Sequence, residues 1–186
     1  LLEKKGELVR IREEVDPVLE ITAITDKVSK SAGGGKALLF ENPKGSAFPL
    51  LINAFGSYQR MSWALGVDDL EEHARSIREL LEMKPPKGFV DKLKLLPKLA
   101  DIAKFPPVEA GKGACQEVVE TSPDLASLPV LKCWPQDGGR FITLPLVYTL
   151  DPETGVRNIG MYRMQVYDSR TTGMHWQVHH HGAAHH

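Results

Sequence analysis

The chain has 186 residues, of which 42% are hydrophobic and 25% are charged, and its formal net charge is −1. This length allows one domain or two small ones with a real hydrophobic core. The composition excludes a wholly disordered chain, a collagen and a coiled coil. Because 23 basic residues face 24 acidic ones, binding to nucleic acid or to an anionic membrane through a general basic field is not expected.

Cysteine usage and hydropathy predict a cytoplasmic setting. Cys115 and Cys133 form neither a CxxC motif nor a disulfide framework. No apolar run approaches the length of roughly 20 residues that a membrane-spanning helix needs.

The two ends of the sequence suggest a piece of a longer protein. The chain opens without an initiator Met, and residues 1–6 are typical of a last helical turn closed by Gly6. Six of the seven histidines lie between His175 and His186. A purification tag is one interpretation of His185 and His186, but a tag is uninterrupted, whereas residues 174–179 alternate like a strand.

The first half of the chain predicts an α/β arrangement. Residues 7–12 alternate like a strand, and Asp16-Pro17 predicts a helix that starts with Asp16 as N-cap. The apolar stripe of that helix is Val18, Ile21, Ile24 and Val28. Gly33 to Gly35 predict a loop, since no phosphate-binding spacing follows. Residues 37–40 and 49–55 predict strands.

A second helix is predicted around residues 70–81, where Asp68 and Glu71 resemble a capping box. From Pro85 to Pro107 the sequence becomes rich in proline and lysine, which is typical of a linker. After about Ala114 the helical patterns stop, and four strands are predicted, at residues 116–120, 142–150, 159–167 and 174–180. Residues 151–155 and 169–173 supply turns between them. The sequence therefore predicts an α+β chain whose antiparallel β part is cut off before it can close.

Two segments carry residues suited to chemistry. In Asn158 to Arg163, the Asn offers a neutral oxygen to a hard cation, and Arg163 offers a forked donor to phosphate or carboxylate. An ordinary surface strand with an exposed arginine is the other interpretation. In a strand over 174–181, His175, Gln177, His179 and His181 would share one face and could bind a transition metal. Incidental surface histidines or a tag are the alternative.

Taken in order, these segments resemble one family, the UbiD-type decarboxylases related to the 3-polyprenyl-4-hydroxybenzoate carboxy-lyase of ubiquinone synthesis. The matching stretches follow one another along nearly the whole chain, at residues 2–8, 15–21, 37–45, 85–89, 124–130, 133–135, 158–163 and 175–177. Family members have about two and a half times this length.

The resemblance implies a reversible, non-oxidative decarboxylase (a carboxy-lyase) of aromatic or α,β-unsaturated acids. It implies prenylated FMN as cofactor, with a divalent cation, usually Mn²⁺, and in many members K⁺ at the phosphate. It also implies an N-terminal α/β domain over residues 1–105. The start of a flavin-reductase-like split β-barrel, which binds the cofactor, would occupy residues 106–186.

Site residues carry over from the family one by one. Asn158 matches a ligand of the divalent metal, and Arg163 matches the arginine that contacts both the flavin ring and the substrate carboxylate. His181 matches a metal-binding histidine that also lines the cofactor, although His180 competes for this position. The other cofactor-lining positions are Met161, Tyr162, Arg163, His175, Trp176, Gln177 and His180. The family's acidic catalytic residues match nothing here, because no Asp or Glu follows Asp168, so the chain alone is not expected to turn over.

The family also implies partners and a location. A homo-oligomer (a dimer or a hexamer), a prenyl-flavin synthase that supplies the cofactor, an aromatic carboxylic acid as substrate and no nucleic acid are expected. The expected location is the cytoplasm, free or peripheral to a membrane. Which acid is the substrate stays open.

Two other kinds of function remain as alternatives. The first is a non-catalytic flavin- or metal-binding module, or an assembly subunit, with the same fold. The second is a small metalloprotein that uses the histidine cluster and needs no flavin.

One geometric question concerns Asn158 and Arg163, which are five residues apart. In a regular strand this odd spacing would place them on opposite faces. Either a bulge or close approach at Gly160 re-aims one of them, or Asn158 precedes the strand. In both cases Asn158 and His181 are expected within side-chain reach of each other.

Overall fold

The computed structural model of the chain describes all residues except 83–96, 98, 101, 105, 107 and 109–110. The chain divides into two compact units, one made of residues 1–65 and 122–186 and the other of residues 66–121. The predicted linker from Pro85 to Pro107 lies largely outside the described residues. A domain boundary between residues 105 and 106 stays a prediction.

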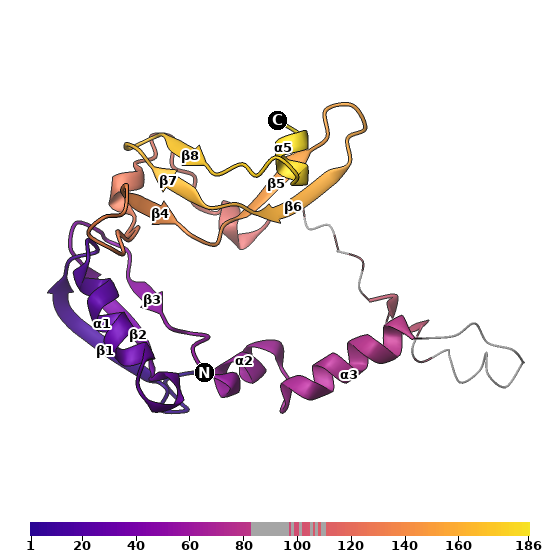
Figure 1. Cartoon of the computed structure of the whole chain (residues 1–186), viewed down its shortest axis with the longest axis horizontal. Helices are drawn as coiled ribbons and strands as arrows, with labels where there is room; N and C mark the ends of the chain where they lie inside the picture. Colours follow the sequence, from indigo (N-terminus) through magenta and orange to yellow (C-terminus); the bar gives the residue numbers. More distant parts are fainter. Residues whose placement is uncertain (83–96, 98, 101, 105, 107, 109–110) are drawn as a thin grey trace, which may run out of the picture. The chain divides into compact units, whose positions relative to one another are not determined.

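The N-terminal sheet of the first unit contains three strands in the order β1 (Leu8–Val15), β2 (Ala37–Pro43) and β3 (Leu50–Ile52) (Figure 1). β1 and β2 run parallel, and β3 is antiparallel to β2. α1 (Glu20–Ser29) connects β1 to β2, since parallel neighbours need a long crossover. The buried core of this layer is Val15, Ile21, Leu38 and Phe40. The α/β character predicted for this part is confirmed.

The start of α1 differs from the prediction, which made Asp16 the N-cap and Pro17 the first helical residue. The helix begins at Glu20, and the preceding Leu19 has a φ of 73°. Residues 17–19 pair with Lys132 instead: the Lys132 N–H donates to Pro17 O, and the Leu19 N–H donates to Lys132 O. This bridge to a distant segment holds the backbone out of the helix. Asp16 closes a local turn, because its Oδ1 accepts from the Val18 N–H at 2.8 Å.

Arg60 is the largest fully buried side chain of the first unit and belongs to α2 (Tyr58–Leu65). Its Nη1 donates to Glu7 Oε2 at 2.6 Å and to Gly35 O at 2.8 Å. Gly35 ends the glycine run, which forms a loop around a short 3₁₀ turn, η1 (Ala32–Gly34), as predicted. A Cβ at Gly34 would overlap Gly56 O, so this loop lies directly against the start of α2.

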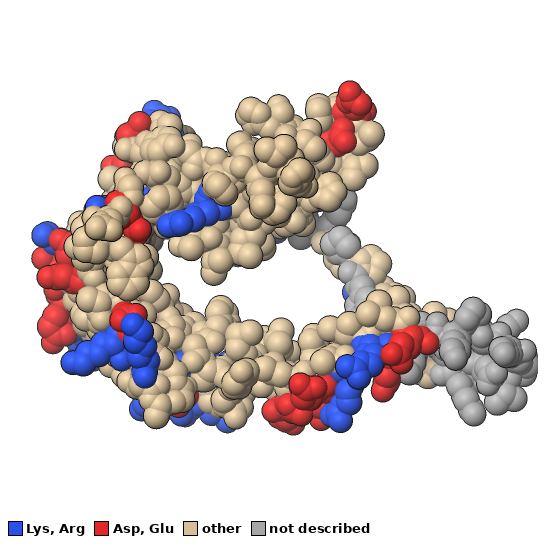
Figure 2. Space-filling model, in the orientation of Figure 1, with Lys and Arg blue, Asp and Glu red and all other residues tan. Residues whose placement is uncertain are grey.

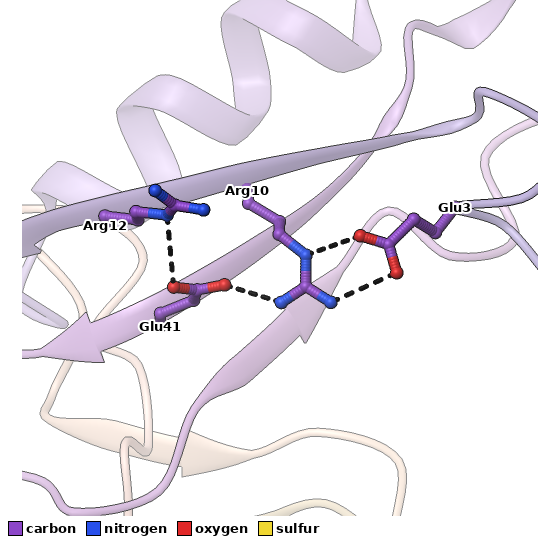
Figure 3. Close-up of polar contacts among 4 residues, drawn as sticks. All are labelled: Glu3, Arg10, Arg12 and Glu41. Carbon is purple, nitrogen blue, oxygen red and sulfur yellow. Dashed lines mark hydrogen bonds and ion pairs between the residues drawn. The ribbon is translucent and has the colours of Figure 1, made fainter.

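A network of four charged side chains ties the first residues to the sheet (Figure 3). Arg10 on β1 donates to Glu3 at 2.8 Å and to Glu41 on β2, and Arg12 lies 3.7 Å from the same Glu41. The hydrogen bond from Arg10 lowers the pKa of the Glu3 carboxyl. Glu3 belongs to the turn that ends at Gly6 (φ 71°), and this turn has helical hydrogen bonds such as Lys5 N–H to Leu1 O, as predicted.

α3 (Leu70–Leu81) lies in the second unit and has the predicted span. Its cap differs by one residue: Asp69, not Asp68, accepts from the Glu71 N–H at 3.1 Å. Acidic and basic side chains alternate along this helix (Figure 2), as is typical of a solvated helix face. No helix among the described residues has the length and apolar character that crossing a bilayer requires.

The C-terminal part of the first unit contains two antiparallel sheets. One has the order β4 (Arg140–Ile142), β7 (Met164–Val166) and β8 (Thr172–Met174). The other pairs β5 (Leu146–Leu150) with β6 (Arg157–Met161), and α5 (His181–Ala184) lies against β6 (Figure 1). These strands confirm the predicted antiparallel texture, but no closed barrel is seen among the described residues.

Three predicted strands are interrupted in the structure. The run 142–150 is interrupted before β5 at Pro145, which lacks a backbone donor. The run 159–167 is interrupted at Tyr162 and Arg163, between β6 and β7. The run 174–180 is a strand only at Met174, after which the chain turns and enters α5.

The predicted strand at 116–120 is also wrong. The short helix η2 (Ala114–Gln116) precedes residues 117–120, which have no strand pairing, and a second short helix, η3 (Leu125–Ser127), follows. β3 is shorter than predicted, since Asn53 directly after it has a φ of 57°. Both predicted turns are present. Asp151 accepts from the Glu153 and Thr154 N–H groups, and Asp168 accepts from those of Arg170 and Thr171.

Candidate functional site

The break at Tyr162 and Arg163 answers the question raised by the odd spacing of Asn158 and Arg163. Gly160 keeps the regular register opposite Val147, so no bulge occurs there. A Cβ at Gly160 would overlap the Tyr162 ring, so Gly160 marks a close approach instead. The chain leaves one sheet after Met161 and enters another at Met164, which places Asn158 within β6 and Arg163 in the break directly before β7.

Arg163 directly precedes β7 and borders one face of the β4–β7–β8 sheet. Phe141, Gln165 and Gly173 are directly opposite one another on the three strands and therefore share a face. Arg163 and Tyr167, two residues before and after Gln165, belong to the same face by alternation. This face borders a cavity of about 310 Å³ lined by Phe141, Arg163, Gln165, Tyr167, Gly173, Met174 and His175.

The guanidinium of Arg163 rests on an aromatic ring. Its Cζ lies 3.9 Å from the centroid of the Phe141 ring, within the range of a cation–π contact. Among the described residues no carboxylate forms an ion pair with Arg163. The edge of the group, which carries its N–H donors, is therefore available to a ligand.

Of the residues that line this cavity, the sequence predicted Arg163 and His175 but not the other five, which are Phe141, Gln165, Tyr167, Gly173 and Met174. Alternation along β7 could have found Gln165 and Tyr167, since both follow Arg163 at even spacing. Phe141 could not be found in this way, because its position depends on a pairing between distant strands. Position 173 has room only for glycine, because a Cβ there would overlap the Tyr167 hydroxyl.

Tyr162, Trp176 and His180, three of the predicted cofactor-lining residues, form an aromatic cluster. Tyr162 is only 4% exposed, and its hydroxyl accepts from the Gly182 N–H at 2.8 Å. Its ring lies 5.3 Å from Trp176 and 6.0 Å from His180 between centroids, both edge to face. A Cβ at Gly182 would stand 2.6 Å from both Trp176 and Tyr162, so the first turn of α5 packs tightly on this cluster.

Asn158 lies half-buried on β6, directly opposite Thr149 on β5. The Thr149 hydroxyl hydrogen-bonds His185 Nδ1 at 2.9 Å, which brings the end of α5 over this pair. Asn158 Nδ2 is buried without a hydrogen-bond partner. The oxygen and nitrogen of an amide side chain are told apart by their hydrogen-bond partners. Because this atom has none, the side chain can equally place its oxygen here and present it to a ligand.

The remaining predicted residues are more exposed. Met161 points out from β6, and Gln177 accepts the His180 N–H through its backbone oxygen. His181 is the exposed first residue of α5. The predicted common face of His175, Gln177, His179 and His181 is wrong because β8 ends at Met174. In the described part of the chain, no three His, Cys, Asp or Glu residues form a group that could hold a metal ion.

Comparison with known proteins places the chain among the UbiD proteins at both ends. The family model of the 3-octaprenyl-4-hydroxybenzoate carboxy-lyase N-terminal domain matches residues 1–81, and that of the carboxy-lyase Rift-related domain matches residues 107–186. An uncharacterized protein of Archaeoglobus fulgidus is 53% identical over 184 residues. This alignment covers 99% of the chain and 37% of the relative, so the chain spans little more than a third of that protein's length.

Solved structures agree. Vanillic acid decarboxylase of Sedimentibacter hydroxybenzoicus matches with a TM-score of 0.74 and 28% identity, over 99% of this chain and 37% of that one. The UbiD-class enzyme HmfF of Pelotomaculum thermopropionicum, solved with FMN, matches with a TM-score of 0.68 and 29% identity, over 98% and 36%. An evolved dimeric form of HmfF was solved with prenylated FMN and matches with a TM-score of 0.66 and 30% identity, over 95% and 36%. The chain belongs to the UbiD family.

Proposed function

We propose that this chain is the part of a decarboxylase of aromatic or α,β-unsaturated carboxylic acids that holds the cofactor and orients the substrate carboxylate. One observation carries the proposal: Arg163 borders a cavity with its N–H donors unpaired by any described carboxylate. In a member of the UbiD family this is the chemistry that an acid substrate requires. The vanillic acid decarboxylase supports the same class of substrate.

Arg163 acts as the carboxylate-orienting residue. A guanidinium remains charged at any working pH and can form two parallel hydrogen bonds to one carboxylate. Holding the acid in a fixed orientation lowers the entropic cost of reaching the transition state. Lysine would keep the charge but lose the fork.

Prenylated FMN fits the residues present, because the cavity beside Arg163 combines aromatic walls with free donors. Arg163 and His175 would contact it from the sheet face. The other residues proposed to line it are Met161, Tyr162, Trp176, Gln177, His180 and His181. When bound, this cofactor would supply the electron-accepting ring that the loss of CO₂ from an unsaturated acid needs. The FMN and prenylated FMN of HmfF support this choice.

A divalent cation, Mn²⁺ or a similar ion, is proposed at Asn158 and His181. The buried side-chain nitrogen of Asn158, which has no hydrogen-bond partner, supports a ligand at this end of the amide once its oxygen and nitrogen exchange places. Two protein ligands are too few for a six-coordinate ion. The cofactor phosphate, with K⁺ beside it, and carboxylates from outside this chain would complete the site.

The finer features of the assembly are also proposals. An α/β domain over residues 1–105 is followed by a split β-barrel that starts within residues 106–186. The whole protein forms a homo-oligomer in the cytoplasm, and a prenyl-flavin synthase supplies its cofactor. The dimeric form of HmfF supports the homo-oligomer.

The test is substitution of Arg163 in the whole enzyme that carries this chain. Arg163→Lys should lose most of the turnover, roughly 100-fold or more, while still binding the cofactor, because the charge persists and the paired geometry does not. Arg157→Lys is the matched control, since Arg157 is exposed at the start of β6. Turnover of Arg163→Ala at nearly the parent rate would show that the assigned role is wrong.

A further inference from the structure

Phe141 contacts Arg163 in the candidate site, and the function proposed above gives it no role. Its ring lies under the guanidinium of Arg163, at 3.9 Å from Cζ to ring centroid. A guanidinium that stacks on a ring uses its face and leaves its edge free. The edge is the part that forms a paired contact with a carboxylate.

The backbone that carries the Phe141 ring is hydrogen-bonded on both sides. The Phe141 N–H donates to Leu131 O at 3.1 Å, and Leu131 packs against the buried core of the N-terminal sheet. On its other side β4 pairs with β7, where Phe141 is opposite Gln165. Gln165 in turn donates to Gly138 O at 3.0 Å, which fixes the turn before β4.

Arg163, by contrast, has little else to hold it. It lies in the break between β6 and β7, and its side chain is exposed. Its backbone oxygen accepts from the His175 N–H at 2.9 Å. No described carboxylate restrains the guanidinium. A long side chain in this state samples many rotamers unless a contact selects one.

We propose that Phe141 is a positioning residue for Arg163: its ring fixes the plane of the guanidinium so that the free edge meets the carboxylate of an aryl acid. This inference rests on the proposed role of Arg163. Phe141 contributes no donor and no charge, so it acts on the acid only through Arg163. A cation–π contact that a bound ligand shields from water corresponds to roughly a fivefold to thirtyfold change in affinity.

The test measures binding of benzoate and of benzamide, its uncharged analogue, to the whole enzyme with its cofactor bound. Phe141→Leu should weaken benzoate about fivefold to thirtyfold and leave benzamide unchanged, whereas Phe141→Tyr should restore benzoate because it keeps the ring. Phe48→Leu is the control, since Phe48 is an exposed phenylalanine on the loop before β3. Its benzoate affinity should equal that of the parent.

An Arg163→Ala background separates the two proposals. There, Phe141→Leu should have no further effect on benzoate. If it still weakens benzoate, or if it weakens benzamide equally, Phe141 only shapes the cavity and the inference is wrong. If Arg163→Ala itself binds benzoate as the parent does, the proposed role of Arg163 fails instead.

Discussion

Arg60 and Arg163 carry the same guanidinium group, and their different burial gives it different roles. The Arg60 side chain is 1% exposed and binds Glu7 and Gly35, so its charge serves the fold. Arg163 is exposed on a cavity with its edge free, so its charge is available to a ligand. The family motif made Arg163 predictable from the sequence. Arg60 was not predictable, because no local pattern indicates which arginine of a helix is buried against a distant glycine loop.

Replacing the carboxylate partner of Arg60 should destabilise the fold more than the same change at the surface. Glu7→Gln should lower the free energy of unfolding by about 1–3 kcal/mol, because it leaves a buried guanidinium without its anionic partner. Glu41→Gln is the matched control, expected to cost about 0–1 kcal/mol. Glu7 and Glu41 are similarly exposed, at 34% and 31%, but the arginine partners are 1% and 40% exposed. Equal losses in urea unfolding would show that burial of Arg60 contributes nothing.

Among the elements, most spans in the first half of the chain follow from local patterns, whereas the start of α1 and the breaks in the later strands depend on contacts between distant segments. α3 has the predicted span because its apolar spacing and acidic first turn act within the helix itself. The predicted start of α1 is wrong because Lys132 pairs with residues 17–19 and keeps them out of the helix. The predicted strand over 159–167 is broken for a similar reason. Met161 pairs with β5, whereas Met164 pairs with β4 and β8, so the chain changes sheets between them.

The hairpin of β7 and β8 should respond to acid through Asp168. Hydrogen bonds from the Arg170 backbone and from Thr171 lower the pKa of this carboxyl. Because the folded state favours the charged form, this contribution is complete above the ordinary pKa near 3.8 and is lost as the pH falls through the lowered value. The amide NMR signals of Arg170 and Thr171 should therefore shift below about pH 4. In Asp168→Asn, which cannot titrate, they should stay constant; the same acid shift in both proteins would contradict the assignment.

At the scale of the whole molecule, the α+β class and the order of its parts could be predicted, but the sheet arrangement could not. Hydrophobic periodicity reports which residues are buried, not which strand lies beside which. The pairing of β4 with β7 across two intervening strands depends on such non-local contacts. For the same reason the sequence indicated Asn158 and Arg163 as site residues but could not show that the chain changes sheets between them.

The sheet of β5 and β6 exposes an apolar face, which should make the isolated chain self-associate. The side chains on this face are all more than half exposed: Leu146, Tyr148, Leu150, Ile159 and Met161. Such a contiguous patch is unusual on a soluble monomer and favours association. Tyr148 and Ile159 are directly opposite each other on the two strands, so one pair of substitutions reaches the centre of the face.

Tyr148→Lys with Ile159→Lys should therefore shift the chain toward monomer in sedimentation velocity across a concentration series, because two charges oppose the burial of this face. Phe55→Lys with Tyr58→Lys is the matched control, since these two side chains are at least as exposed and lie at the start of α2. The control should associate like the parent. If the β5–β6 pair leaves association unchanged while the control abolishes it, the surface around α2 is the contact and this face is not.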